Sequence, residues 1–474
     1  MESFDISSLG KIAEGVFLEE GIPACRQVYT PPDTTLKSIP KVYIPKFIDA
    51  LTRPLTEEEK KSGTYMPPNR DGVLMTGDFD EVQKAFFGEL WECPQGGGPW
   101  AEMIDGLPVT PPTRRRIDEM LKGTSHPPDE VINFGGRRGG DKKIITVEKV
   151  AINAVMAGCQ PELLPAVLAI AESGACVGYP GDSSFGHMYL VSGPYAREIR
   201  MNSGFCYLIP GNPANTALQR AGTLMGINLG GVQHGINNLE RTGPLHWGTI
   251  FAEHEDSPWE HLNEHFGYKP DESILMSWGQ KVQLVPFQNI EVKSAENLQH
   301  NHSGTPDHAV AALKTLTNTG GGLLAFTPDS AHYWAEEYGF KTMRQLKDYM
   351  WDNVTRKRSD WVQNYWFWTR GGVQKFGGEG AGTTTPNLPP GGGLPISGPP
   401  GGQTGGGPQG LRGVPKRGSR ALNPDHFDLP DNADIPLFRS PEDITVIVAG
   451  GTGEAWTWGG SFGKPQIFSI DKWR

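Results

Sequence analysis

Hydrophobic positions recur at helical spacing through the middle of the chain. In TVEKVAINAVMAGC one face of a helix is apolar, formed by Val147, Val150, Ala151, Ala154 and Val155. Thr146 can cap this helix, Glu148 suits the positive end of its dipole, and Gly158 ends it. Further helices are expected in PELLPAVLAIAES, ANTALQRAGTLMGINLGG and TMRQLKDYMWDNVTRK.

Short apolar runs alternate with these helices. MYLVSGP, GGLLAF and EDITVIV have the length and composition of buried strands, and the last of them runs into the glycine turn AGGTG. An alternation of strands and helices predicts an α/β fold, with a layered core of mixed sheet and helices. The sequence contains no visible internal repeat.

The pattern weakens at both ends and in one insert. We expect an irregular N-terminal arm with a short strand–helix unit at 1–95, in which Asp78 caps a helix, and the main α/β core at 96–370. A Gly/Pro-rich linker or loop follows at 371–420, and 421–474 returns a strand to the core. The insert has too few apolar residues to offset its own ordering entropy, so it is either a linker or a segment held by a partner subunit.

Composition narrows the class of protein. A length of 474 residues suggests two or three domains, or one large domain with extensions. The net charge is −11. No stripe of Lys and Arg with aromatic residues appears, so no nucleic-acid partner is expected. No segment reaches the roughly 20 apolar residues of a membrane span, and the first residues lack a signal-peptide layout. We expect a soluble, cytoplasmic protein whose five cysteines stay reduced.

The stretch FAEHEDSPWEHLNEH, residues 251 to 265, crowds three histidines and five carboxylates into fifteen positions. Ser257 and Glu260 form the pattern of a capping box, which predicts a helix that begins there and ends at Gly267. On such a helix His261 and His265 are one turn apart. The HLNEH pattern matches a zinc-peptidase motif without the long core helix that the motif needs.

Two interpretations of this stretch stay open. In one, His254, His261 and His265 ligate a divalent transition metal. In the other, the stretch is a solvated helix. A second pair, His300 and His302, lies in a polar segment close to Asp307 and His308, and is either part of the same metal site or a wet loop.

The residues FAEHE end an apolar run. Alternation along a strand places Glu253 and Glu255 on one side and His254 on the other. A carboxylate pair at a strand end is suited to acid–base catalysis, and the alternative is a pair of ordinary surface acids.

The remaining candidates are one thiol and several small polar residues. Cys206 is the most accessible cysteine candidate, whereas Cys159 ends an apolar helix and is expected to be buried with a raised pKa. Polar residues close to glycines, which either bind an anion or cap a helix, are the next ligand-binding candidates: Asn202, Ser203, Asn212 and Asn215. The others are Gly451 and Thr452 in the glycine turn, Asn153 and Trp259.

Five stretches in fixed order resemble a known family: DGLPVTPPTRRRIDEML, TVEKVAINAVMAGCQPELLPAVLAI, GNPANTALQRAGTLMGINLGG, FAEHEDSPWEHLNEHFGYKPDES and EDITVIVAGGTGE. The set is similar to the large bacterial proteins associated with the UGSC-motif (seleno)protein family, over about residues 72–370 and 440–455. The resemblance implies thiol or selenol redox chemistry with a companion that carries the Sec- or Cys-Gly-Ser-Cys motif. This chain contains no CGSC motif.

Three functional hypotheses follow. The first is a subunit of a two-component enzyme that acts on a small molecule with a thiol- or selenol-bearing partner, in a reductive or lyase-type reaction. Its site would lie in a cleft between 146–159, 202–215, 253–259 and 450–453. The second is a metal-dependent hydrolase or lyase that uses the histidine clusters. The third is a non-catalytic assembly scaffold, and a homo-oligomer fits each of them.

Overall fold

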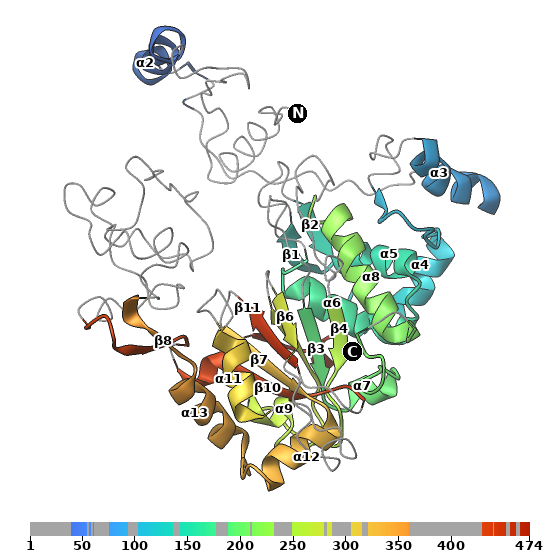
Figure 1. Cartoon of the computed structure of the whole chain (residues 1–474). Helices are drawn as coiled ribbons and strands as arrows, with labels where there is room; N and C mark the ends of the chain where they lie inside the picture. Colours follow the sequence, from blue (N-terminus) through green and yellow to red (C-terminus); the bar gives the residue numbers. More distant parts are fainter. Residues whose placement is uncertain are drawn as a thin grey trace.

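The computed structural model describes residues 39–54, 56–57, 60, 75–92, 103–135, 143–176, 188–208, 211–231, 249–278, 282–286, 305–314, 321–359, 429–438, 440–451, 456–460 and 465–474. It is an α/β protein in which helices pack against mixed sheets, as the sequence pattern predicts (Figure 1). The predicted Gly/Pro-rich segment at 371–420 lies outside these residues.

The first sheet has the order β12-β5-β3-β4. Its strands are β3 (Met188–Ser192), β4 (Thr249–Ala252), β5 (Ile274–Trp278) and β12 (Gln466–Ser469). β4 runs parallel to β3, β5 is antiparallel to β3, and β12 is antiparallel to β5.

The second sheet has the order β10-β7-β11-β6. Its strands are β6 (Val282–Pro286), β7 (Gly321–Phe326), β10 (Ile444–Val448) and β11 (Trp456–Gly460). β10 runs parallel to β7, β11 is antiparallel to β7, and β6 is antiparallel to β11. The segment 421–474 was predicted to return one strand to the core. It supplies three strands to these sheets, β10 and β11 to the second and β12 to the first.

The two sheets repeat one plan. In the first half, β3 to β6, a parallel pair is followed by an antiparallel neighbour and then by a strand that leaves for the other sheet. In the second half, β7 and β10 to β12, the same order recurs, so β6 and β12 are exchanged between the halves. The backbone N–H of His254, after β4, donates to Val448 O of β10 at 2.7 Å. A two-fold relation between β4 and β10 describes this pattern, although the sequence shows no repeat.

Helices cover the sheets from opposite sides. The first core packs α5 (Val147–Ala157), α6 (Leu164–Glu172) and α8 (Pro213–Asn228) against Tyr189 and Val191 of β3. The second core packs α11 (Pro306–Lys314), α12 (Pro328–Glu336) and α13 (Met343–Asn353) on the other face of β3, which is formed by Met188 and Leu190. Successive residues of β3 thus face different cores, as the two-residue period of a strand requires. Figure 1 shows the two groups of helices on either side of the strands.

Local sequence explains the main helices. Thr146 accepts a hydrogen bond from Lys149 N at 3.4 Å at the start of α5, and Gly158 ends this helix with φ +84°, both as predicted. Asn212 caps α8 by accepting from Asn215 N at 3.0 Å. Thr342 and Gln345 make a capping box at α13.

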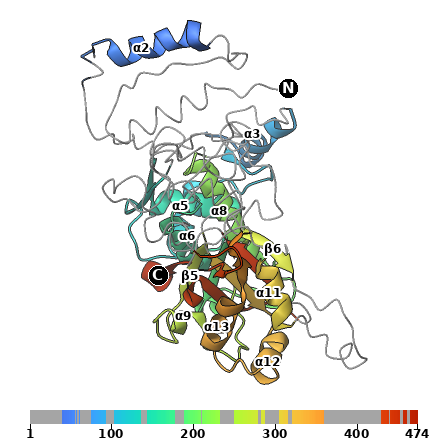
Figure 2. The ribbon, with the colours of Figure 1, turned by 60° about the vertical axis from the view of Figure 1, so that its left-hand side comes forward.

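The other elements are short or peripheral: η1 (Ile39–Tyr43), α2 (Ile44–Thr52), α3 (Phe79–Glu92), α4 (Arg114–Leu121), β1 (Val131–Gly135), β2 (Lys143–Thr146), η3 (Pro161–Leu163), α7 (Tyr195–Glu198), α9 (Leu262–His265), β8 (Thr355–Lys357), β9 (Asp434–Pro436), η6 (Pro441–Asp443) and η7 (Asp471–Trp473). Asp78 caps α3, as expected, by accepting from Glu81 N at 2.9 Å. Figures 1 and 2 both show α2 away from the sheets. No helix in the described ranges is long and apolar enough to cross a membrane.

The helix predicted from Ser257 onward is wrong. Ser257 accepts a hydrogen bond from Trp259 N at 3.1 Å in a turn, and the helix α9 is a single turn at Leu262–His265. The first two backbone N–H groups of α9 have no acceptor within the helix. Leu262 N donates to Glu253, after β4, and Asn263 N donates to Ser192, at the end of β3. Caps from the sheet therefore decide where α9 begins, and the local capping-box pattern does not.

Candidate functional site

The carboxyl ends of both parallel strand pairs meet at one place, which we call the carboxyl edge. Beyond the bond between His254 N and Val448 O, Ala449 N donates to Phe326 O at 2.8 Å, and Gly450 N donates to Ser203 O at 2.6 Å. The crossover helix α8 belongs to the first core, whereas α12 and α13 belong to the second. The connections of the two pairs thus leave in opposite directions. This is the arrangement of a topological switch point, where α/β proteins commonly bind ligands.

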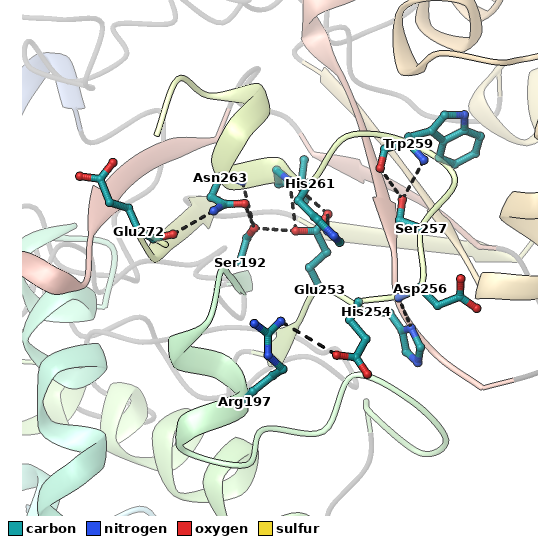
Figure 3. Close-up of polar contacts among 12 residues, drawn as sticks. Ser192, Arg197, Glu253, His254, Asp256, Ser257, Trp259, His261, Asn263 and Glu272 are labelled. Atoms are coloured by element: carbon teal, nitrogen blue, oxygen red, sulfur yellow. Dashed lines mark hydrogen bonds and ion pairs between the residues drawn. The ribbon is translucent and has the colours of Figure 1, made fainter. Parts of the chain in front are cut away.

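Glu253 is the buried acid of the carboxyl edge. Its side chain is 5% exposed and follows directly after β4. Ser192 Oγ, at the end of β3, donates to it at 2.5 Å, and Leu262 N approaches both carboxylate oxygens at 3.1 Å (Figure 3). Ser192 Oγ in turn accepts from Asn263 N at 3.0 Å. These hydrogen bonds fix the orientation of the carboxylate.

The imidazole of His261 is the basic partner of Glu253. Its Nδ1 lies 3.7 Å from Glu253 Oε1, and its side chain is 40% exposed. Glu253 raises the pKa of His261 above its ordinary value of 6.5, against desolvation and the nearby positive charge of Arg197, which lower it. A partly exposed imidazole with a raised pKa can give a proton to a bound molecule and take it back.

The predicted pairing of Glu253 with Glu255 is not found. Glu255 is 70% exposed, and its carboxylate lies 4.0 Å from Arg197 Nη1. Strand alternation does not extend to these residues because β4 ends at Ala252. Glu253 therefore turns inward to Ser192, while Glu255 faces solvent.

The three histidines of residues 251–265 do not converge. His254 Nδ1 accepts from Asp256 N at 3.0 Å, and the Asp256 carboxylate lies 2.7 Å from His332 Nε2. His265 has its own partners, with Nδ1 2.7 Å from Glu260 and Nε2 2.9 Å from Lys347 Nζ. His261 pairs with Glu253.

No metal site appears in the part of the chain that the structure describes. There, no three His, Cys, Asp or Glu side chains are grouped so that they could hold a metal ion. His300 and His302 lie outside the described residues, so their predicted role stays a prediction.

The loop 201–208 is fastened by asparagines. Asn215 Oδ1 accepts from Asn202 N at 2.9 Å, and Asn215 Nδ2 donates to Asn202 O at 2.9 Å. Asn212 caps α8 and donates to Arg200 O at 3.0 Å. The side chains of Asn212 and Asn215 are thus engaged within the protein, and they hold Ser203 against the turn after β10.

Cys206 is exposed at the tip of this loop, with φ +62°. Its neighbour Phe205 lies over Gly451, where an added Cβ would come within 2.2 Å of the ring. Cys159 and Cys176 are buried, and burial raises the pKa of each thiol to about 12. Among the described cysteines, Cys206 is therefore the accessible thiol, and the expectation for Cys159 is confirmed.

Three further candidates lie apart from these groups. Asn153 is buried between α5 and α8, where its Oδ1 accepts from Asn228 Nδ2 at 2.8 Å. Trp259 is buried and donates from Nε1 to Phe340 O at 2.8 Å, which anchors the loop after β4. Thr452 lies outside the described residues, next to Gly451.

Sequence reasoning missed Ser192 and Arg197. Both follow the pattern that function gathers at carboxyl ends of strands, since Ser192 ends β3 and Arg197 lies in α7 just beyond it. The sequence signal that could have identified both residues is the apolar run MYLVS followed by Gly-Pro, which marks the end of a strand.

The chain was compared with protein-family models, with curated proteins and with solved structures, and none of the three comparisons found a match. The geometry of the carboxyl edge is thus the ground on which a function is proposed.

Proposed function

We propose that this chain is a subunit of a two-component enzyme that binds a small molecule at the carboxyl edge. The reaction is reductive or lyase-type and needs a companion that bears a thiol or selenol. The observation that carries the proposal is the buried carboxylate of Glu253, 3.7 Å from the partly exposed imidazole of His261. A fixed carboxylate behind an accessible imidazole is the usual arrangement of an acid–base pair.

His261 is the group that moves a proton in this proposal. Glu253 orients the ring and stabilises its protonated form, and Ser192 holds Glu253 in place. Glu253 touches His261 and the backbone of α9, so it acts through His261. In the lyase form, neutral His261 removes a proton from one carbon of the substrate, and the freed electron pair forms a double bond to the neighbouring carbon. The group on that carbon leaves with its bonding electron pair and takes a proton from the thiol or selenol of the companion, so no net oxidation or reduction occurs.

The reductive form needs electrons from the companion. Two thiols, or one thiol and one selenol, become a disulfide or a selenenyl sulfide and release two electrons and two protons. The substrate accepts both electrons and both protons, one of them through His261. The resemblance to the UGSC-associated proteins and the absence of a CGSC motif from this chain support a separate donor.

Two surface features suit a companion or a second copy of the chain. Cys206 is exposed beside the turn after β10. The helix α2 and the residues before it expose four apolar side chains, Val42, Ile44, Ile48 and Leu51. Exposed apolar faces of this kind commonly mark protein–protein contacts.

The test uses the full chain with and without a companion that carries the Cys- or Sec-Gly-Ser-Cys motif. Each preparation is incubated with a metabolite extract, and mass spectrometry follows which compound is consumed. We expect consumption only when both proteins are present. Turnover by the chain alone, without any added thiol protein, contradicts the proposal.

A matched pair of variants ties turnover to the site. His261→Asn should retain the companion and lose about a hundredfold or more of the turnover, because proton transfer by a positioned side chain typically contributes this much. The control is His126→Asn, since His126 also pairs with an acid, Glu130 at 2.8 Å, and packs against Trp473. Equal turnover by the two variants would rule out His261.

A further inference from the structure

Arg197 presents a loosely held positive charge at the carboxyl edge. Its backbone is fixed within the short helix α7, where Arg197 N donates to Pro194 O at 3.0 Å. Its guanidinium is 65% exposed, and the ion pair with Glu255, at 4.0 Å, is at the outer limit of such contacts. A planar guanidinium makes far shorter paired contacts with a carboxylate when the two are matched.

We propose that Arg197 and His261 bind the carboxylate of a small anionic substrate, and that Glu255 occupies the place of this carboxylate while the site is empty. The inference rests on the proposed function, because that function puts the substrate at the carboxyl edge. It adds the substrate class and gives Glu255 a role other than acid–base catalysis.

Three observations favour an anion between these two residues. Arg197 follows β3 and His261 follows β4, and the two strands are adjacent and parallel. Both side chains are partly exposed, so both can reach a ligand. The positive charge of Arg197 lowers the pKa of His261, which means that the two cations repel each other. An anion placed between them relieves this repulsion.

Glu255 behaves as a weak internal competitor. It is exposed, its ion pair within the described part of the chain is the one with Arg197 at 4.0 Å, and an exposed pair of this kind contributes little to stability. A ligand carboxylate can therefore replace it at small cost. Glu253 cannot be replaced in this way, because it is buried and bonded to Ser192 and to the N–H of Leu262.

The proposal is tested by anion binding to the full-length chain alone. Acetate and malonate serve as probes, potassium chloride at equal ionic strength is the blank, and the ring C–H signal of His261 is followed by NMR on protein with labelled histidine. The groups that act on this ring are Glu253, Glu264 and Arg197. We expect carboxylates to shift the signal and to raise the pKa of His261, since an added negative charge favours the imidazolium.

The variants predict opposite changes in affinity. Arg197→Gln should weaken carboxylate binding about tenfold or more, as expected for a lost charge-assisted hydrogen bond. Glu255→Gln should tighten binding up to about fivefold, because the competitor is removed. Arg344→Gln is the control, since Arg344 is similarly exposed and pairs with Asp348 and Glu442 at 2.8 Å each. It should leave binding unchanged.

Several results would overturn the proposal. They are equal binding by wild type and Arg197→Gln, weaker binding by Glu255→Gln, or a loss in Arg344→Gln as large as that in Arg197→Gln. Failure here is distinguishable from failure of the proposed function. Anion binding is measured without a companion and without turnover, whereas the proposed function is judged by turnover that requires both proteins.

Discussion

The two halves of the molecule share a strand plan and differ at their carboxyl ends. The first half ends its parallel strands with Ser192, Glu253 and the charged loop that contains His261. At the corresponding places, the second half has Thr327 after β7 and Ala449 after β10, where Ala449 N donates to Phe326 O as Glu253 N donates to Val191 O. Thr327 Oγ1 donates within its own turn to Asp329 at 2.5 Å. The comparison indicates that the first half places a buried carboxylate directly after its second parallel strand, whereas the second half has a neutral turn after β10, against which the loop 201–208 packs.

The largest effect on stability should come from Glu253→Ala. The change leaves the N–H of Leu262 without its acceptor and Ser192 Oγ with only the longer contact to Asn263 Oδ1, at 3.4 Å, and should lower the free energy of unfolding by about 3 kcal/mol. Thr327→Ala, at the end of β7, should cost only about 1 kcal/mol because its hydroxyl bonds within one turn. Urea unfolding measures the loss of stability in both variants, and equal losses would contradict the predicted difference between the two halves.

The glycines after the strands should rank next. Gly193, after β3, has φ +104°, and an added Cβ would lie 2.5 Å from the backbone oxygen of Glu272. Gly450, after β10, has φ +108°, and its nearest neighbour would be the Tyr207 ring at 3.0 Å. Gly193→Ala should cost about 2–3 kcal/mol and Gly450→Ala about 1–2 kcal/mol, because backbone yields less than a side chain. Thermal unfolding that gives the reverse order would contradict the geometry.

The crossover helices of the two halves should respond alike to loss of their caps. Asn212→Ala at α8 and Thr342→Ala at α13 each remove a side chain that accepts from a backbone N–H of the first turn, and each should cost about 1 kcal/mol. Asn212→Ala should be the worse of the two, since Asn212 also donates to Arg200 O. Chemical unfolding of both variants measures this. A negligible loss at α8 would show that Asn212 does not fasten the loop.

The smallest expected effect is a pH dependence of stability from His261. Glu253 raises the pKa of His261 in the folded protein above the ordinary 6.5, so the folded state binds the proton more tightly than the unfolded state. The stabilisation is fully present below pH 6.5 and is lost as pH rises through the folded-state pKa. We expect a shallow fall in stability there, well below 1 kcal/mol because the ring is partly exposed. His261→Asn should flatten this fall, and an unchanged profile would place the dependence elsewhere.

The sequence was sufficient for features that depend on near neighbours. Thr146 and Gly158 bound α5 as expected, because a cap and a left-handed glycine act within one helical turn. Strands such as β3 and β10 were recognisable as short apolar runs. Their pairing was not recognisable, since a run of five apolar residues does not specify its neighbour. The two-fold plan of the sheets therefore became visible only in the structure.

The candidate site was only partly predictable for the same reason. Glu253 was named from its place after an apolar run, but its partner Ser192 is 61 positions away in the sequence. The beginning of α9 depends on that pair, and the nearby Ser257 and Glu260 do not determine where the helix begins. The predicted convergence of His254 and His265 also failed in the described residues, because each histidine has a different acidic or backbone partner.

The central claim is that buried Glu253 controls the proton of His261. The most direct test is the pKa of His261 in the full-length protein, measured by NMR titration in the wild type and in Glu253→Gln. We expect a pKa above 6.5 in the wild type and a clear decrease in the variant, because the amide keeps much of the shape but lacks the charge. A pKa at or below 6.5 that does not change in Glu253→Gln would contradict the claim.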